Sequence, residues 1–168
     1  MRWLEWEAVE SAAPVIYARV EGWSRETWWG RLLALCIAGC CLAVLIVAAG
    51  LTPSPHGLGT HQELGLDQCQ FLRRSGLPCP GCGMTTSFSW FVRGNLAASF
   101  YIQPMGCVLA ALCGICTWAG AYIAVTGRPI YRLLGLVPSR YWVMPLLGLA
   151  VAAWGWKIFL HLSGHDGW

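Results

Sequence analysis

Three long apolar segments constrain the fold of this chain more than any other feature. Residues 32–51 contain no charged side chain, and a helix of that length spans about 30 Å, the thickness of the hydrocarbon core of a bilayer. Residues 105–126 and 142–162 are two further segments of membrane length, and we expect Lys157 in the last one to snorkel to the membrane boundary. The sequence therefore predicts an all-α integral membrane protein with three transmembrane helices.

The composition supports this prediction and excludes one class of partner. Hydrophobic residues make up 57% of the chain and charged residues only 11%, whereas soluble domains carry about 25% charged residues. The net charge is +3 and the basic residues are scattered along the chain, so no nucleic acid partner is expected. The expected surrounding of the apolar segments is the lipid bilayer.

The remaining segments divide the chain into three parts. Residues 1–31 mix charged and Trp side chains, which predicts an amphipathic interfacial segment. Residues 32–162 form the membrane domain, in which 52–104 hold a loop and short helices, and residues 163–168 form a tail. Residues 84–92 are apolar but too short to cross a bilayer, so they predict a short interfacial or re-entrant helix. Asn95 could cap a second short helix, 96–102, and Pro104 is expected to open the second span.

Basic residues on the two sides of the predicted spans indicate an orientation. Four Arg precede the first span and three lie in the loop 127–141, whereas the opposite side holds three Arg and Lys157. Because basic residues are enriched in cytoplasmic loops, the N-terminus is predicted to be cytoplasmic and the cysteine-containing loop extracytoplasmic. The chain would then be a multi-pass protein of the cell membrane.

The residues best suited to chemistry lie in that loop. Six of the nine Cys lie in apolar segments, where Cys packs as a small hydrophobe. The other three, Cys69, Cys79 and Cys82, lie in the polar loop, the last two in a Cys-Pro-Gly-Cys-Gly turn. Pro80 fixes one backbone angle of this turn, and Gly83 permits a left-handed conformation after it.

One use of the turn is metal binding. Cys79 and Cys82 could hold a zinc ion, with Cys69 as a third ligand and His61 or His56 as a fourth. Two chains could instead share one site, each contributing its turn. Apart from zinc, no cofactor is expected.

The turn could also act without a metal. Cys79 and Cys82 could form a disulfide or a redox pair in an oxidising compartment, ahead of a helix that Thr85, Thr86 or Ser87 could cap. The remaining alternative is a tight turn with reduced thiols that directs the following helix into the membrane.

The sequence contains no recognisable catalytic set, so a non-enzymatic role is favoured. Gly106, Ala110 and Gly114 form a small-residue stripe that lets helices approach closely. The main hypothesis is a non-catalytic membrane module that binds a membrane protein partner or a second copy of itself. The alternatives are a thiol-redox or metal-binding protein that uses the cysteine turn, and an oligomeric transport component. His161 and His165 share a helical spacing, but their place near the C-terminus indicates a solvated tail.

A family resemblance begins at the cysteine turn. The residues from Cys79 to Phe88 read Cys-Pro-Gly-Cys-Gly-Met-Thr-Thr-Ser-Phe. This stretch resembles the signature Cys-Pro-x-Cys-Gly-x-Thr-Arg of a bacterial membrane family, domain of unknown function 2752, in which a Gly-Asp segment and an Asn-Pro follow. The resemblance covers residues 79–104.

Three positions depart from the family pattern. Thr86 stands in place of the usual Arg, Asn95 in place of Asp, and Gln103 in place of Asn. If the Arg and Asp pair in relatives, Thr86 and Asn95 would keep a neutral, hydrogen-bonded version of that contact. The resemblance implies a short multi-span architecture but no particular activity. The motif it implies consists of Cys79, Pro80, Cys82, Gly83, Thr85, Thr86, Phe88, Gly94, Asn95, Gln103 and Pro104.

Overall fold

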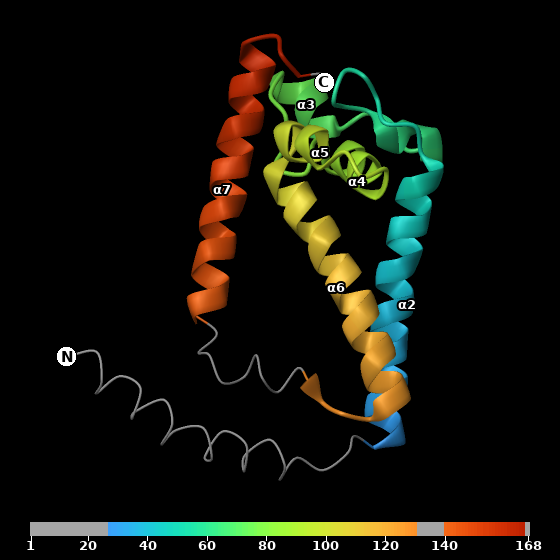
Figure 1. Ribbon diagram of the computed structural model, residues 1–168. Coiled ribbons are helices and arrows are strands. Elements are labelled where there is room, and N and C mark those ends of the chain that lie inside the picture. The colour runs from blue at the N-terminus through green and yellow to red at the C-terminus, as the bar shows by residue number, and fades with distance from the viewer. Residues whose placement is uncertain (1–26, 131–139, 167–168) are drawn as a thin grey trace, which may run out of the picture.

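The computed structural model describes residues 27–130 and 140–166, and within these ranges every regular element is a helix. Three helices of 23 residues, α2 (Trp28–Gly50), α6 (Pro104–Thr126) and α7 (Arg140–Leu162), are each long and apolar enough to cross a membrane (Figure 1). The predicted all-α fold with three membrane-length helices is confirmed. Residues 1–26 of the predicted interfacial segment 1–31 lie outside the described residues.

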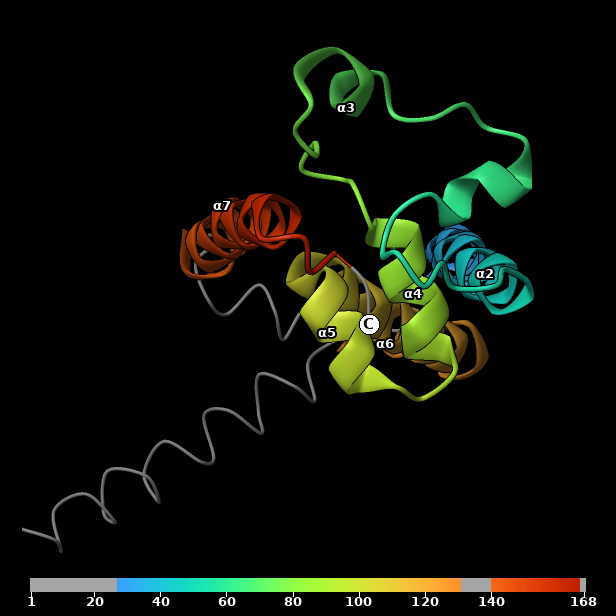
Figure 2. The ribbon, with the colours of Figure 1, turned by 90° about the horizontal axis from the view of Figure 1, so that it is seen from above.

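α2 and α6 run antiparallel and lie side by side (Figures 1 and 2). Arg31, near the start of α2, donates hydrogen bonds to the backbone oxygens of Ala124 and Val125 at the end of α6, both at 2.8 Å. The last four carbonyls of a helix have no partner within the helix. The guanidinium therefore satisfies two such groups and joins the two helices at the end that lies away from the cysteine loop.

Small residues let α6 pack closely against its neighbours. A Cβ on Gly120 would lie only 2.6 Å from the backbone oxygen of Ala34 on α2. Of the predicted stripe, Gly106 and Ala110 are buried, whereas a Cβ on Gly114 would meet nothing within 4 Å. The stripe thus serves packing within the chain at its first two positions, and the close approach to α2 occurs at a glycine that the stripe did not include.

Residues 51–103, which we call the cap, lie between α2 and α6 in the chain and gather at one end of the long helices (Figure 1). α4 packs against α2 and α6, and α5 lies on the side that faces α7 (Figure 2). The bounds of α4 and α5 agree with the two short helices predicted from the sequence. The elements of the cap are the 3-10 helix η1 (Thr60–Leu64), α3 (Gln70–Ser75), α4 (Met84–Val92) and α5 (Leu96–Ile102).

The two short helices of the cap begin in different ways. The side chain of Asn95 accepts a hydrogen bond of 3.0 Å from a backbone N–H in the first turn of α5, as predicted. α4 instead starts after Gly83, and no side chain caps it. The prediction that Thr85, Thr86 or Ser87 caps α4 is wrong, because all three lie inside the helix.

Buried hydroxyl groups and a small apolar cluster hold the cap together. The hydroxyl of Ser87 on α4 donates to the backbone oxygen of Ser99 on α5 at 2.9 Å, and the hydroxyl of Ser99 donates to the backbone oxygen of Ser87 at 2.8 Å. Beside this pair, Ala48, Phe88 and Ala110 form an apolar cluster that joins α2, α4 and α6. The cap is therefore fixed to both of the first two spans.

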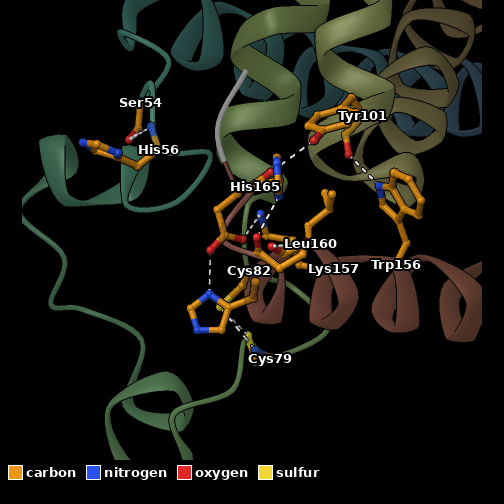
Figure 3. Close-up of polar contacts among 12 residues, drawn as sticks. Ser54, His56, Cys79, Cys82, Tyr101, Trp156, Lys157, Leu160 and His165 are labelled. Atoms are coloured by element: carbon orange, nitrogen blue, oxygen red, sulfur yellow. Dashed lines mark hydrogen bonds and ion pairs between the residues drawn. The ribbon is translucent and has the colours of Figure 1, made fainter.

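α7 contacts the cap through its C-terminal half. The indole N–H of Trp154 donates to the backbone oxygen of Pro78 at 3.0 Å, and that of Trp156 donates to the backbone oxygen of Tyr101 at 2.7 Å (Figure 3). An indole N–H that is removed from water needs such an acceptor. The two hydrogen bonds therefore fix the position of α7 along its axis relative to the cysteine loop and to α5.

Lys157 on α7 does not reach water, and the expectation that it snorkels is wrong. Its side chain is fully buried, and its Nζ lies 3.1 Å from Oδ1 of Asp166. The residues after α7 fold back and bring this carboxylate to the ammonium group. The tail is likewise not simply solvated, because Nδ1 of His161 lies 2.5 Å from the other carboxylate oxygen of Asp166.

Candidate thiol centre

Three sulfur atoms converge in the cap. The sulfurs of Cys69, Cys79 and Cys82 all lie within 4.8 Å of one another, and those of Cys79 and Cys82 are 3.3 Å apart. Two segments build this cluster: Cys69 directly precedes α3, and the other two lie in the turn before α4. The three loop cysteines singled out from the sequence are thus brought together, and we call their cluster the thiol centre.

The backbone of the turn directs its two sulfurs to one side. The N–H of Cys82 donates to the backbone oxygen of Cys79 at 3.0 Å, and the N–H of Met84 donates to that of Gly81 at 3.2 Å. The N–H of Cys79 also points at the sulfur of Cys82, at 3.3 Å. These bonds close the turn, and Cys79 and Cys82 lie next to each other as a result (Figure 3).

The two histidines considered as a fourth ligand line the same pocket but do not join the cluster. His61 and His56 border, together with the three cysteines, a pocket of about 960 Å³. Nε2 of His61 lies 3.2 Å from the backbone oxygen of Asp67, and His56 lies apart from Cys79 and Cys82 (Figure 3). Within residues 27–130 and 140–166, the group of close ligand atoms consists of the three sulfurs alone.

Two of the thiols have pKa shifts of opposite sign. The backbone N–H of Leu72 holds the pKa of Cys69 below the ordinary thiol value, since it stabilises the thiolate. Burial raises the pKa of Cys82 to about 12, and the hydrogen bond with the Cys79 side chain adds to this shift. A bound cation would offset the raised pKa of Cys82, because its charge would stabilise the thiolate in place of the proton.

A buried side-chain amide stabilises the cysteine turn through a hydrogen bond. The side chain of Gln103 is fully buried, and its Nε2 donates to the backbone oxygen of Pro80 at 2.8 Å. Gln103 also precedes Pro104, the first residue of α6. The family resemblance singled out this residue, whereas nothing in the sequence indicated its contact with the turn.

Gly83 occupies a position that no other residue fits easily. Its φ angle is +85°, in the left-handed region that favours glycine. A Cβ at this position would lie 3.0 Å from the backbone oxygen of Gly57, 3.3 Å from Cγ2 of Ile102 and 3.5 Å from Cε of Lys157. Both the conformation and the crowding therefore require glycine here.

The predicted contact between Thr86 and Asn95 is not formed. The hydroxyl of Thr86 lies 2.8 Å from that of Thr60, so that this buried pair joins α4 to η1. The side chain of Asn95 is occupied at the start of α5. Both polar groups already have partners, and the two motif positions act separately.

The other motif residues shape the backbone or pack around the centre. Gly94 has a φ angle of +80° between α4 and α5, and Phe88 belongs to the apolar cluster. Thr85 lines the pocket beside the cysteines. Trp154 also donates a hydrogen bond to Pro78, the residue before the turn, although no local pattern in the sequence indicates this.

Comparison with known proteins gives one match. Residues 69–117 match the family model described as "Protein of unknown function (DUF2752)". This match confirms the resemblance to the domain of unknown function, and it spans the three cysteines of the thiol centre, α3 to α5 and the first part of α6. α2 and α7 lie outside it. The comparisons with curated proteins and with solved structures found no match.

Proposed function

We propose that this multi-pass membrane protein binds a thiophilic divalent metal ion, of which Zn²⁺ is the prime candidate, through Cys69, Cys79 and Cys82. The observation that carries the proposal is the convergence of three sulfurs from two separate segments within 4.8 Å. Zn–S bonds of about 2.3 Å in a tetrahedral site put the sulfurs about 3.8 Å apart. Small side-chain adjustments would therefore bring all three sulfurs to one ion.

The role we propose for this ion is non-catalytic. The ion would join the start of α3 to the cysteine turn and so set the surface of the cap. That surface would be available to a membrane protein partner or to a second copy of the chain, either of which could supply a fourth ligand. The alternative of an oligomeric transport component stays a prediction.

A disulfide between Cys79 and Cys82 is the second candidate. Their sulfurs are 3.3 Å apart, so little movement separates the two thiols from a covalent bond. Such a bond would leave Cys69 as a single thiol. The arrangement would suit an oxidising compartment, whereas a metal site needs all three thiolates.

We also propose the orientation and origin of the chain. The excess of Arg before the first span and in the loop 127–141 supports a cytoplasmic N-terminus. The cap and its thiol centre would then face the extracytoplasmic side. The Cys-Pro-Gly-Cys-Gly-Met-Thr sequence supports a bacterial origin through its resemblance to the family signature.

A cadmium titration of the full chain in detergent tests the proposed site. Cd²⁺ stands in for Zn²⁺ and its thiolate complexes absorb in the near ultraviolet, so binding can be followed directly. Under reducing conditions we expect one Cd²⁺ per chain, with binding weakened at least about tenfold in Cys69→Ser and in Cys82→Ser. Cys107→Ser, which changes a cysteine of α6, is the matched control and should bind as the wild type does.

Two results would contradict the metal site. One is binding by Cys69→Ser that equals the wild type, since the third sulfur would then have no part in it. The other is absence of binding by the wild type. A mass two hydrogens lower than that of the reduced chain, after purification without reductant and lost in Cys79→Ser, would favour the disulfide instead.

A further inference from the structure

The charged group that the spans bury most completely lies beside the thiol centre. Lys157 on α7 is fully buried, and its Nζ lies 3.1 Å from Oδ1 of Asp166. No hydrogen bond from Nζ to another group accompanies this ion pair among the described residues. Buried ionisable groups in membrane helices are costly and usually have a functional reason.

The Lys157–Asp166 ion pair lies against two segments that border the thiol centre, the loop around Gly57 and the cysteine turn that ends at Gly83. A Cβ on Gly57 would lie 1.8 Å from the backbone oxygen of Asp166 and 3.5 Å from Nζ of Lys157. A Cβ on Gly83 would lie 3.5 Å from Cε of Lys157 and 3.0 Å from the backbone oxygen of Gly57. Because Gly83 directly follows Cys82, the Lys157 stem lies close to the backbone of the cysteine turn. The aliphatic part of Lys157 and the residues after α7 thus lie close to both the loop around Gly57 and the cysteine turn.

Further polar contacts hold the tail in this place. Nδ1 of His161 lies 2.5 Å from Oδ2 of Asp166, and the hydroxyl of Tyr101 donates to the backbone oxygen of His165 at 3.2 Å. The N–H of His165 also donates to the backbone oxygen of Leu160 at 2.9 Å. The carboxylate of Asp166 is therefore presented to Lys157 by a tail that is itself fixed to α7 and α5.

We propose that the Lys157–Asp166 ion pair is a latch that positions the thiol centre. While the pair is closed, the tail covers Gly57, the loop stays against Gly83, and Cys82 stays buried. Lys157 and Asp166 act through the turn and not on a ligand, so they are positioning residues. The link between the latch and metal retention rests on the proposed function, whereas its link to the burial of Cys82 does not.

The physics of buried ion pairs gives the latch a distinctive signature. Removal of Asp166 leaves the fully buried Lys157 charge uncompensated, and removal of Lys157 leaves the Asp166 carboxylate with His161 alone, whereas removal of both leaves neither charge. Either single substitution should therefore open the latch and expose Cys82. The double substitution should expose Cys82 less than the two single effects combined predict, because it leaves neither charge without its partner.

Alkylation of Cys82 in the full chain, followed by peptide mass spectrometry, measures this opening. We expect Lys157→Met and Asp166→Asn each to speed the alkylation of Cys82 by at least about tenfold. The double variant should react faster than the wild type, because it lacks the ion pair, but more slowly than the product of the two single effects, because it holds no unpaired charge. The exposed residues Asp67 and Arg74 give matched controls, and Asp67→Asn and Arg74→Met should leave the rate unchanged.

Cys113 on α6 distinguishes latch opening from unfolding of the whole domain. Its alkylation rate should stay at the wild-type value in the variants that open the latch. If Lys157→Met speeds the alkylation of both Cys82 and Cys113, the rates in Asp166→Asn decide between opening and unfolding, because that substitution changes no residue of the spans. An unchanged Cys82 rate in Asp166→Asn, or rates that multiply in the double variant, would overturn the latch.

A cadmium titration of the same variants separates the latch from the proposed function. We expect Cd²⁺ binding to weaken in both single variants, and to weaken less in the double variant than the two single effects combined predict. If the wild type binds no Cd²⁺ but the alkylation pattern holds, the latch stands and the metal site fails. If Cd²⁺ binding requires the three cysteines but Cys82 alkylation ignores both single substitutions, the metal site stands and the latch fails.

Discussion

Substitution of Gly83 by Ala tests whether the cysteine turn is built as the contacts indicate. The new Cβ would sit in a backbone conformation with a φ angle of +85°, and it would lie 3.0 Å from the backbone oxygen of Gly57 and 3.3 Å from Cγ2 of Ile102. Neither neighbour is the free end of a flexible side chain. The variant therefore combines a conformational cost with overpacking.

The two costs can be estimated separately. A left-handed conformation costs an L-residue roughly 1–2 kcal/mol, and forcing an extra methyl group into a packed region costs about 1–3 kcal/mol. Gly76 provides the matched control: its φ angle is +70°, but a Cβ there would meet nothing within 4 Å. We expect Gly76→Ala to lower the free energy of unfolding by about 1 kcal/mol and Gly83→Ala to lower it by about 3 kcal/mol.

Unfolding of both variants in mixed detergent micelles, followed by circular dichroism, measures the difference. Cadmium titration adds a second readout, since the shifted turn in Gly83→Ala should weaken Cd²⁺ binding while Gly76→Ala should not. Equal loss of stability in the two variants would show that the contacts with Gly57 and Ile102 impose no crowding at residue 83.

Two further predictions concern the turn. Gln103→Leu leaves the backbone oxygen of Pro80 without its partner, so we expect a loss of about 1–3 kcal/mol in the free energy of unfolding and weaker Cd²⁺ binding in the same titration; unchanged binding would show that the amide does not support the turn. The pKa shifts predict an order of alkylation in the metal-free chain as pH rises. Cys69, whose pKa is lowered, should react first, and Cys82, with a pKa of about 12, should still resist at mildly alkaline pH; early labelling of Cys82 at neutral pH would contradict the burial that raises its pKa.

Much of the fold could be predicted because its signals are local. Membrane-length apolar runs fix the three long helices, and the bounds of α4 and α5 follow from short apolar runs separated at Asn95. Pro104 opens α6 because its missing N–H has no partner to lose at a helix start. Such features depend on neighbours in the sequence alone, so no tertiary contact is needed to recognise them.

The candidate site was predictable only in part. The polar loop identified the three cysteines, but their distance from His61 depends on how η1 and the following loop fold, and no spacing rule encodes this. The predicted side-chain cap of α4 does not form, because a glycine in the left-handed region precedes the helix instead. Lys157 could not be placed from its own helix, since its partner Asp166 comes from a tail that folds back.

Zinc K-edge X-ray absorption on the full chain purified from cell membranes counts the sulfur ligands of the bound ion. We predict one zinc per chain with three sulfur neighbours at about 2.3 Å, reduced to two in Cys69→Ser. Zinc surrounded by oxygen and nitrogen alone, or a reduced chain that takes up no zinc even when it is supplied, would contradict the three-cysteine site.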